Sequence, residues 1–237
     1  MKWVEAKNYE EMAAMGARIF IEQLQAKPNS VIGLATGSTP IGLYKELVKS
    51  YNEGTINFEN VTSFNLDEYT GLAKESEFSY YYFMHDNLFN HVNIKADHVN
   101  IPSGDVATIE ETCVNYEKAM VQAGGIDVQL LGIGVNGHIG FNEPGTAFDS
   151  VTQVVELTES TREANKVHFD NPEDVPTHAV TMGISSIMKA KKVVLLISGA
   201  AKQEAFDFLR SGEVTENFPA SALHNHPDVT VIYTDVK

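Results

Sequence analysis

The sequence contains few of the features that mark secreted or membrane proteins. Its single cysteine, Cys113, excludes an internal disulfide and a multi-cysteine metal site. Its longest apolar runs, such as residues 193–197, are far too short to span a bilayer. No apolar segment of the kind found in signal peptides follows Met1. We therefore expect a cytoplasmic protein with no membrane partner.

Positive charge is also scarce. The chain has 17 basic and 32 acidic residues and a formal net charge of −15. Arginine occurs only at Arg18, Arg162 and Arg210. Nucleic-acid binding needs a basic footprint, so this balance argues against a nucleic-acid partner. Any anionic ligand must be held by few basic side chains.

The remaining composition is that of a folded globular domain. The chain has 237 residues, of which 43% are hydrophobic and 21% charged. No repeat of 20–50 residues and no Gly/Ser- or Pro-rich linker divides it. The length favours one domain over residues 1–237.

Strand-like and helix-like segments alternate along the chain. We expect strands at residues 31–35, 61–66, 126–131, 151–157, 192–197 and 229–233, and helices at 9–26, 40–51, 78–90, 106–122, 179–189 and 201–210. Continuous apolar strands between helices predict an α/β fold, a three-layer α/β/α sandwich with a mainly parallel, Rossmann-like sheet. Ligands of such sheets bind beyond the carboxyl ends of the strands, so the loops there are the places to look for chemistry.

The first such loop is rich in hydroxyl groups. Thr36, Gly37, Ser38 and Thr39 lead from a strand to a helix that opens at Pro40. The free N–H groups of a helix N-terminus favour a phosphate. The alternative is that a hydroxyl only caps the helix.

The second loop carries adjacent acids, Asp67 and Glu68, at the end of an apolar strand. Side chains alternate along an extended segment, so one carboxylate can face a pocket while the other braces a loop. The alternative is that both are solvated.

The third loop, residues 131–145, contains five glycines together with His138 and Glu143. Glycines let a backbone approach a ligand closely, and imidazole is the natural acid/base near pH 7. Glu143 could orient His138, although a lone histidine is usually structural. The fourth loop, after residues 192–197, carries Lys202 at a helix start; it is a candidate point charge for an anion or simply a solvated lysine.

Taken together, these loops resemble the glucosamine-6-phosphate deaminase (glucosamine-6-phosphate isomerase) family. The matching stretches are residues 34–40, 65–69, 132–145 and 218–223. The Gly-His loop ending in Phe141-Asn142-Glu143-Pro144 separates this family from the related 6-phosphogluconolactonases, which lack the Asn-Glu-Pro continuation.

The resemblance implies conversion of glucosamine 6-phosphate and water to fructose 6-phosphate and ammonia, with no metal and no other cofactor. It implies that His138 is the base that opens the sugar ring, supported by Glu143 and helped by Asn136. Asp67 then resembles the family's acid/base for proton transfer from C2 to C1. One carboxylate can make both transfers if it stays on one face of the intermediate.

The resemblance also implies a set of substrate-binding residues. Phosphate contacts are implied for Thr36, Gly37, Ser38, Thr39 and Lys202, and a backbone contact with the sugar for Gly137.

Two departures from the family pattern affect these expectations. Many members have Asp where this chain has Asn136, which can hydrogen-bond but cannot take a proton. Regulated hexameric members have an arginine where this chain has Val167, so Arg162 or Lys166 is the expected substitute at the phosphate. Residues 146–156 lack the basic groups of an allosteric site. We predict an unregulated enzyme, a monomer or a homo-oligomer.

Two other functions remain open at this stage. One is a sugar-phosphate lactonase or isomerase of the same fold. The other is a non-catalytic sugar-phosphate sensor, disfavoured because no basic helix-turn-helix region precedes the domain.

Overall fold

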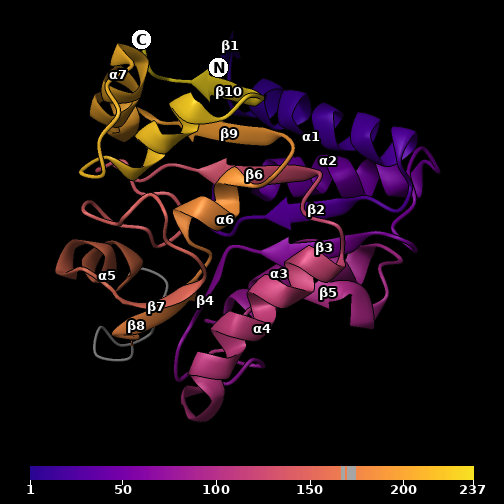
Figure 1. Ribbon diagram of the computed structural model, residues 1–237. Helices are drawn as coiled ribbons and strands as arrows, with labels where there is room; N and C mark the ends of the chain where they lie inside the picture. The colour runs from indigo at the N-terminus through magenta and orange to yellow at the C-terminus, as the bar shows by residue number, and fades with distance from the viewer. Residues whose placement is uncertain (167–168, 170–174) are drawn as a thin grey trace.

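The computed structural model describes residues 1–166, 169 and 175–237 (Figure 1). Within them the chain forms one large, entirely parallel sheet of seven strands, in the order β1-β10-β9-β6-β2-β3-β5. These strands are β1 (Lys2–Glu5), β2 (Val31–Leu34), β3 (Thr62–Asn65), β5 (Val99–Asn100), β6 (Val128–Gly132), β9 (Val193–Ser198) and β10 (Val229–Thr234). The predicted mainly parallel sheet is confirmed.

Helices flank this sheet. They are α1 (Tyr9–Ala26), α2 (Ile41–Asn52), α3 (Tyr80–Asn87), α4 (Ile109–Gln122), α5 (Glu159–Asn165), α6 (Ile184–Met188) and α7 (Gln203–Ser211), with a 3-10 segment, η7, at Pro219–Asn225. The start of α1 illustrates the local rules. The side chain of Asn8 accepts a hydrogen bond from the backbone N–H of Glu11, and two acids occupy the first turn. None of the described helices is both long and apolar enough to cross a membrane.

Successive residues of β9 show that the helices cover both faces of the sheet. Leu196 and Ile197 point to opposite faces because side chains alternate along a strand. Leu196 lies against Gly16 of α1. Ile197 is in register with Tyr233, whose ring packs against Phe206 of α7. Helices α1 and α7 therefore lie on opposite sides of the sheet, which is the predicted three-layer arrangement (Figure 1).

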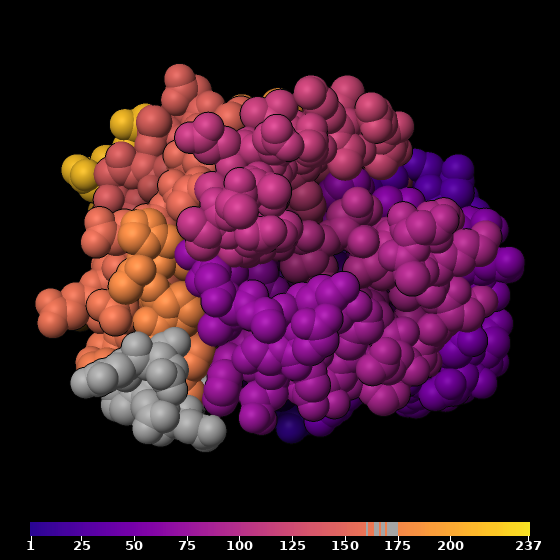
Figure 2. All heavy atoms as spheres, turned by 90° about the horizontal axis from the view of Figure 1, so that it is seen from below, coloured from indigo at the N-terminus to yellow at the C-terminus, as the bar shows by residue number. Residues whose placement is uncertain are grey.

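A second, antiparallel sheet has the order β4-β8-β7. Its strands are β4 (Asp67–Tyr69), β7 (Gln153–Glu156) and β8 (His178–Thr181). The pairing joins distant parts of the chain, and in Figure 2 the orange surface around β7 and β8 adjoins the purple surface of the segment that follows β3. The small sheet was not predicted, and it carries Asp67.

The predicted helix over residues 179–189 is wrong in its first half. Ala179, Val180 and Thr181 belong to β8, and only Ile184–Met188 is helical. The two β-branched residues favour an extended backbone. Pairing with β4 on one side and β7 on the other then fixes this segment as the middle strand.

The other predicted elements correspond to observed ones with shifts of a few residues. The end of the predicted helix over 78–90 and the start of the one over 106–122 are 3-10 turns, Phe89–His91 and Val106–Thr108. Strands β1 and β5 were missed because they are short and half-buried. Cys113, on α4, is half-buried.

A buried carboxylate just before β6 connects this strand with the end of α1, with β2 and with the start of β9. Asp127 is 4% exposed and accepts hydrogen bonds from the ammonium groups of Lys27 and Lys191, each at 2.7 Å, and from the backbone N–H of Val31 at 2.8 Å. Burial alone raises its pKa, but these donors lower the pKa below the usual aspartate value. Asp127 therefore ties the end of α1 to β2, β6 and the start of β9.

We expect Asp127→Asn to destabilise the protein by about 2 kcal/mol, because a charged acceptor of three donors is lost. Since the folded-state pKa is depressed, this stabilisation is complete above the unfolded pKa of about 3.9 and is lost as the pH falls through the lower folded value. Urea denaturation at pH 7 and pH 3 measures both effects. The exposed Asp97→Asn serves as the control, and equal midpoints for Asp127→Asn and wild type at pH 7 would contradict the assignment.

Candidate active site

A cavity of about 450 Å³ lies at the carboxyl ends of four adjacent strands of the large sheet, β9, β6, β2 and β3. Each of the four predicted loops contributes to it. The lining includes Thr36, Gly37, Ser38, Thr39, Asp67, Tyr80, Asn136, His138, Thr161 and Lys202. This is the edge of the sheet where parallel α/β folds bind ligands.

The loop between β2 and α2 presents unused hydrogen-bond donors. Tyr9 donates its hydroxyl to the carbonyls of Ser38 at 3.1 Å and Thr39 at 3.0 Å, and accepts the N–H of Gly42 at 2.9 Å. No hydrogen bond among the described residues uses the N–H groups of Gly37, Ser38 or Thr39. With its carbonyls occupied and its N–H groups free, the loop at the start of α2 suits an anion.

Lys202 lines the same cavity as this loop and lies in the turn after β9. It is half-buried, and burial lowers the pKa of its ammonium group. Among the described residues that line the cavity it is the one lysine or arginine. The cavity therefore combines a helix N-terminus with one point charge, a pairing that fits a phosphate group.

Asp67 lies where β3 gives way to β4, in register with Thr181 of β8. It is 5% exposed. Burial, followed by the charge of Glu68, raises the pKa of Asp67 to about 8. A carboxyl group that titrates near neutral pH is suited to taking up and returning a proton.

His138, Asn136 and Glu143 form a hydrogen-bonded array. The Asn136 side-chain nitrogen donates to Glu143 Oε2 at 2.7 Å, which leaves its Oδ1 as an acceptor 2.8 Å from His138 Nδ1. Since an amide oxygen cannot donate, Nδ1 must carry the proton. His138 Nε2 is then the nitrogen with a free lone pair, as a general base requires. Glu143 Oε2 itself is 3.5 Å from His138 Nδ1, so Asn136 is the direct partner of the imidazole.

Two threonines hold Glu143 from behind. The hydroxyls of Thr158, at 3.3 Å, and of Thr161 donate to Glu143 Oε1. Burial alone would raise the pKa of Glu143. The nearby His138 imidazole, which attracts the carboxylate when it is protonated, the Thr161 hydroxyl and the Asn136 amide together lower it to about 2. Glu143 is therefore a permanent anion that can stabilise a proton on His138.

Close packing at Gly134 lets the imidazole reach this position. A Cβ atom at Gly134 would lie 2.2 Å from His138 Cε1, so any side chain would displace the ring. At Gly140, which has a φ of +57°, a Cβ atom would lie 2.9 Å from Thr181 Oγ1 and 3.4 Å from Asp67 Oδ2. Gly134 thus leaves room for the His138 ring, and Gly140 lets the third loop approach Asp67 closely.

Three predicted site residues do not line the cavity. Glu143 lies behind Asn136, as described above. Gly137 donates its N–H to the Gly134 carbonyl at 3.0 Å and accepts the N–H of Ala220 at 2.9 Å, so its backbone contact with a sugar stays a prediction. Arg162, on α5, has a buried Nε that makes no hydrogen bond to the described residues, and Arg162 is not among the residues that line the cavity. Val167 lies outside the described residues.

Tyr80 and the two threonines were not among the predicted site residues. Tyr80, on α3, lines the cavity, and its hydroxyl bonds to Thr36 and, at 3.3 Å, to Tyr69. No motif in the sequence connects it to the second loop. Thr158 was in principle recognisable as the N-cap of α5, since its side chain accepts the N–H of Thr161, but nothing in the spacing relates it to Glu143.

The arrangement provides one cavity with an anion site, an imidazole and a buried carboxyl group, and Glu143 lies behind the imidazole. No group of three His, Cys, Asp or Glu side chains in the described part of the chain is placed to hold a metal ion. The side chains present can move protons on a small phosphorylated substrate.

Two curated relatives match almost the full length of the chain. A glucosamine-6-phosphate deaminase of Lysinibacillus sphaericus (strain C3-41) is 58% identical over 233 residues, covering 98% of each chain. A glucosamine-6-phosphate deaminase of Thermoanaerobacter pseudethanolicus (strain ATCC 33223 / 39E) is 53% identical over 232 residues, covering 98% of this chain and 92% of its own.

Solved structures agree with these relatives. A structure described as that of a monomeric glucosamine-6-phosphate deaminase superposes with a TM-score of 0.96 at 47% identity, covering 98% of this chain and 97% of its own. The 6-phosphogluconolactonase of Trypanosoma brucei, at 20% identity, a TM-score of 0.77 and coverage of 98% and 95%, shares the fold. The family model for glucosamine-6-phosphate isomerases/6-phosphogluconolactonase matches residues 5–232. The chain belongs to the glucosamine-6-phosphate isomerase/6-phosphogluconolactonase family.

Proposed function

We infer that this chain converts glucosamine 6-phosphate and water to fructose 6-phosphate and ammonia, a step of amino sugar breakdown. The observation that carries this inference is that the side chains of the cavity suit the reaction for which the relatives are named. Full-length relatives at 58% and 53% identity are glucosamine-6-phosphate deaminases. The cavity holds the proton-transfer groups and the anion site that this reaction needs.

Ring opening is assigned to the His138 array. His138 Nε2 takes the proton of the anomeric hydroxyl, and the imidazolium so formed gives it to the ring oxygen as the bond between C1 and the ring oxygen breaks. The Asn136 amide holds the imidazole in the tautomer that leaves Nε2 free. Ionised Glu143, 3.5 Å from Nδ1, stabilises the transient imidazolium. Asn136 thus orients and does not relay a proton.

Isomerisation and deamination are assigned to Asp67. Its carboxylate removes the proton from C2 and returns it to C1 on the same face of the enolamine. The resulting iminium at C2 adds water and then expels ammonia, which leaves the ketone of fructose 6-phosphate. A carboxyl group with a raised pKa holds the proton between the two transfers without releasing it to solvent.

The phosphate is assigned to the N–H groups of Gly37, Ser38 and Thr39 and to Lys202. The hydroxyl of Thr36 bonds to Tyr80, so we give it a supporting role at the wall. Arg162 and Gly137 remain candidates for further contacts, the former if its α5 turn moves toward the cavity when substrate binds.

We further propose that residues 1–237 work as one catalytic domain, because the cavity draws side chains from Thr36 to Lys202. A monomer is favoured by the structural neighbour described as monomeric. We place the enzyme in the cytoplasm, since a charged sugar phosphate does not cross a bilayer unaided. Nothing in the reaction requires a cofactor.

Ammonia release from glucosamine 6-phosphate tests the proposed function directly. The purified protein should release ammonia and form fructose 6-phosphate in equal amounts. Hydrolysis of 6-phosphogluconolactone without ammonia release would instead favour the lactonase branch of the family. Tight binding of the sugar phosphate without turnover would indicate a sensor.

Asp67→Asn should lower kcat by at least about 10³-fold, because the amide cannot accept the C2 proton. KM should stay within a few-fold, since the phosphate site is untouched. The control is Asp105→Asn, which makes the same change outside the cavity. An unchanged kcat would remove Asp67 from the reaction.

His138→Gln should lower kcat for glucosamine 6-phosphate by about 10²-fold or more through loss of the ring-opening base. The open-chain 2-amino-2-deoxyglucitol 6-phosphate has no ring to open, so its dissociation constant should change little. Calorimetry with this compound provides the comparison. An equal loss of affinity for it would show that His138 serves binding instead.

Lys202→Ala should raise KM by about 10- to 100-fold, the loss expected for one charge-assisted contact with phosphate, and should change kcat less. Lys45→Ala removes the same charge from an exposed position on α2 and is the matched control. A KM equal to that of wild type would exclude Lys202 from the phosphate site.

A further inference from the structure

We propose that Glu68 is a positioning residue that fixes the strand carrying Asp67 to the first turn of the helix carrying Tyr80, and that it keeps a negative charge beside Asp67. The proposal rests on the proposed function, in which Asp67 exchanges the C2 proton. Glu68 itself does not line the catalytic cavity.

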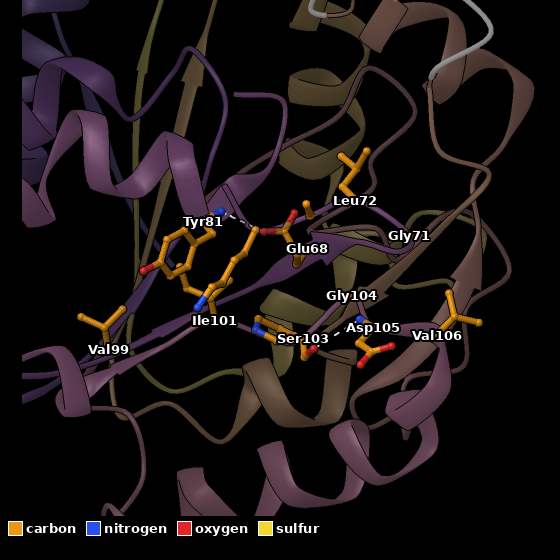
Figure 3. Close-up of a pocket in the computed structure, with 13 residues that line it drawn as sticks. Glu68, Gly71, Leu72, Tyr81, Val99, Ile101, Ser103, Gly104, Asp105 and Val106 are labelled. Carbon is orange, nitrogen blue, oxygen red and sulfur yellow. Dashed lines mark hydrogen bonds between the residues drawn. The ribbon is translucent and has the colours of Figure 1, made fainter. Parts of the chain in front are cut away.

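Glu68 points away from the catalytic cavity. Side chains alternate along β4, so Asp67 faces the catalytic cavity and Glu68 faces the opposite side. There it lines a second cavity of about 610 Å³, together with Tyr81 and Ile101 (Figure 3). Glu68 is 5% exposed. It therefore stands in the wall between the two cavities.

In the described part of the chain, the donors to the Glu68 carboxylate are three backbone N–H groups. Its Oε1 accepts the N–H of Tyr69 at 2.8 Å and of Tyr80 at 2.9 Å. Its Oε2 accepts the N–H of Tyr81 at 2.8 Å, the contact drawn in Figure 3. The next N–H group of α3, that of Tyr82, goes to the N-cap Ser79. Glu68 thus supplies acceptors that the start of α3 would otherwise lack, and the helix dipole favours its negative charge.

These contacts place two residues of the catalytic cavity at once. Asp67 precedes Glu68 on β4, and Tyr80 is the first residue of α3. The Tyr80 hydroxyl bonds to Thr36 at the phosphate loop and to Tyr69. Loss of the carboxylate would loosen β4 from α3, and with it the spacing between Asp67 and Tyr80.

The charge of Glu68 acts on Asp67 as well. The titratable groups coupled to Asp67 are Glu68 on β4 and the phenols of Tyr44 on α2, Tyr69 on β4, Tyr80 on α3 and Tyr116 on α4. Burial raises the pKa of each phenol, so all four are neutral near pH 7.

Other titratable groups face this region from the two cavities. His138 and Lys202 share the catalytic cavity with Asp67, whereas Lys74 and Asp105 share the second cavity with Glu68. Among the described groups coupled to Asp67, only Glu68 adds negative charge. The pKa of Glu68 itself is raised by burial, and its three backbone donors, which favour the ionised form, offset part of that rise.

The test compares Glu68→Gln and Glu68→Asp with wild type, using ammonia release between pH 5 and 9. Gln keeps the shape and removes the charge. It should move the acidic limb of kcat/KM to lower pH by about half a unit or more, because Asp67 then ionises more easily. Asp keeps the charge but is too short to reach α3. It should leave that limb in place and lower kcat by about tenfold or more, the cost of misplacing a reacting group.

Asp86→Asn is the control, since it removes one charge from an exposed position on α3 and should change neither property. An acidic limb within about 0.1 unit of wild type in Glu68→Gln overturns the electrostatic part of the proposal. A kcat for Glu68→Asp equal to that of wild type overturns the positioning part of the proposal. This result stands even if Glu68→Gln does not fold. Failure of the wild-type protein to release ammonia overturns the proposed function instead.

Discussion

The pairing of β4 with β8 is the contact on which the catalytic cavity depends. β4 is three residues long and leaves the large sheet directly after β3. Its antiparallel register with β8 puts Asp67 opposite Thr181, and the Thr181 hydroxyl accepts the N–H of Phe141 at 3.1 Å. One residue of β8 thus connects the second and third loops. Without this pairing Asp67 would lie in a solvated loop with an ordinary acidity.

The electrostatics of the cavity are local and do not follow the net charge. A net charge of −15 opposes long-range attraction of a sugar phosphate. The free N–H groups of one loop and a single ammonium group at Lys202 compensate for this only at contact distance. Binding of substrate should therefore depend little on steering and strongly on the fit at the phosphate loop.

Much of this could be predicted from the sequence because its signals are local. Apolar strands followed by helices predict the parallel sheet, and the sheet predicts the edge where Thr36, Asp67, His138 and Lys202 gather. The alternation of Asp67 and Glu68 between a pocket and a brace also follows from strand geometry alone.

The features that were missed depend on contacts between distant residues. In β8, Ala179 suits a helix whereas Val180 and Thr181 suit a strand, and its two partner strands decide between them. Tertiary packing likewise determines three contacts. These are the hydrogen bond that Thr161 donates to Glu143, the contact of Tyr80 with Tyr69, and the hydrogen bonds of the Gly137 backbone. No spacing rule along the chain encodes such contacts.

The edge of the large sheet has a consequence for how the chain folds. Among the described strands β1 comes first along the chain and pairs only with β10, which comes last, and the two labelled termini lie near each other in Figure 1. A chain emerging from the ribosome therefore holds β1 unpaired until β10 has been synthesised. Trp3, whose ring packs on Phe206 and Tyr233, stays exposed for the same interval. Closure of this edge is a late, long-range event, of the kind that slows folding and leaves a nascent chain in need of protection from aggregation.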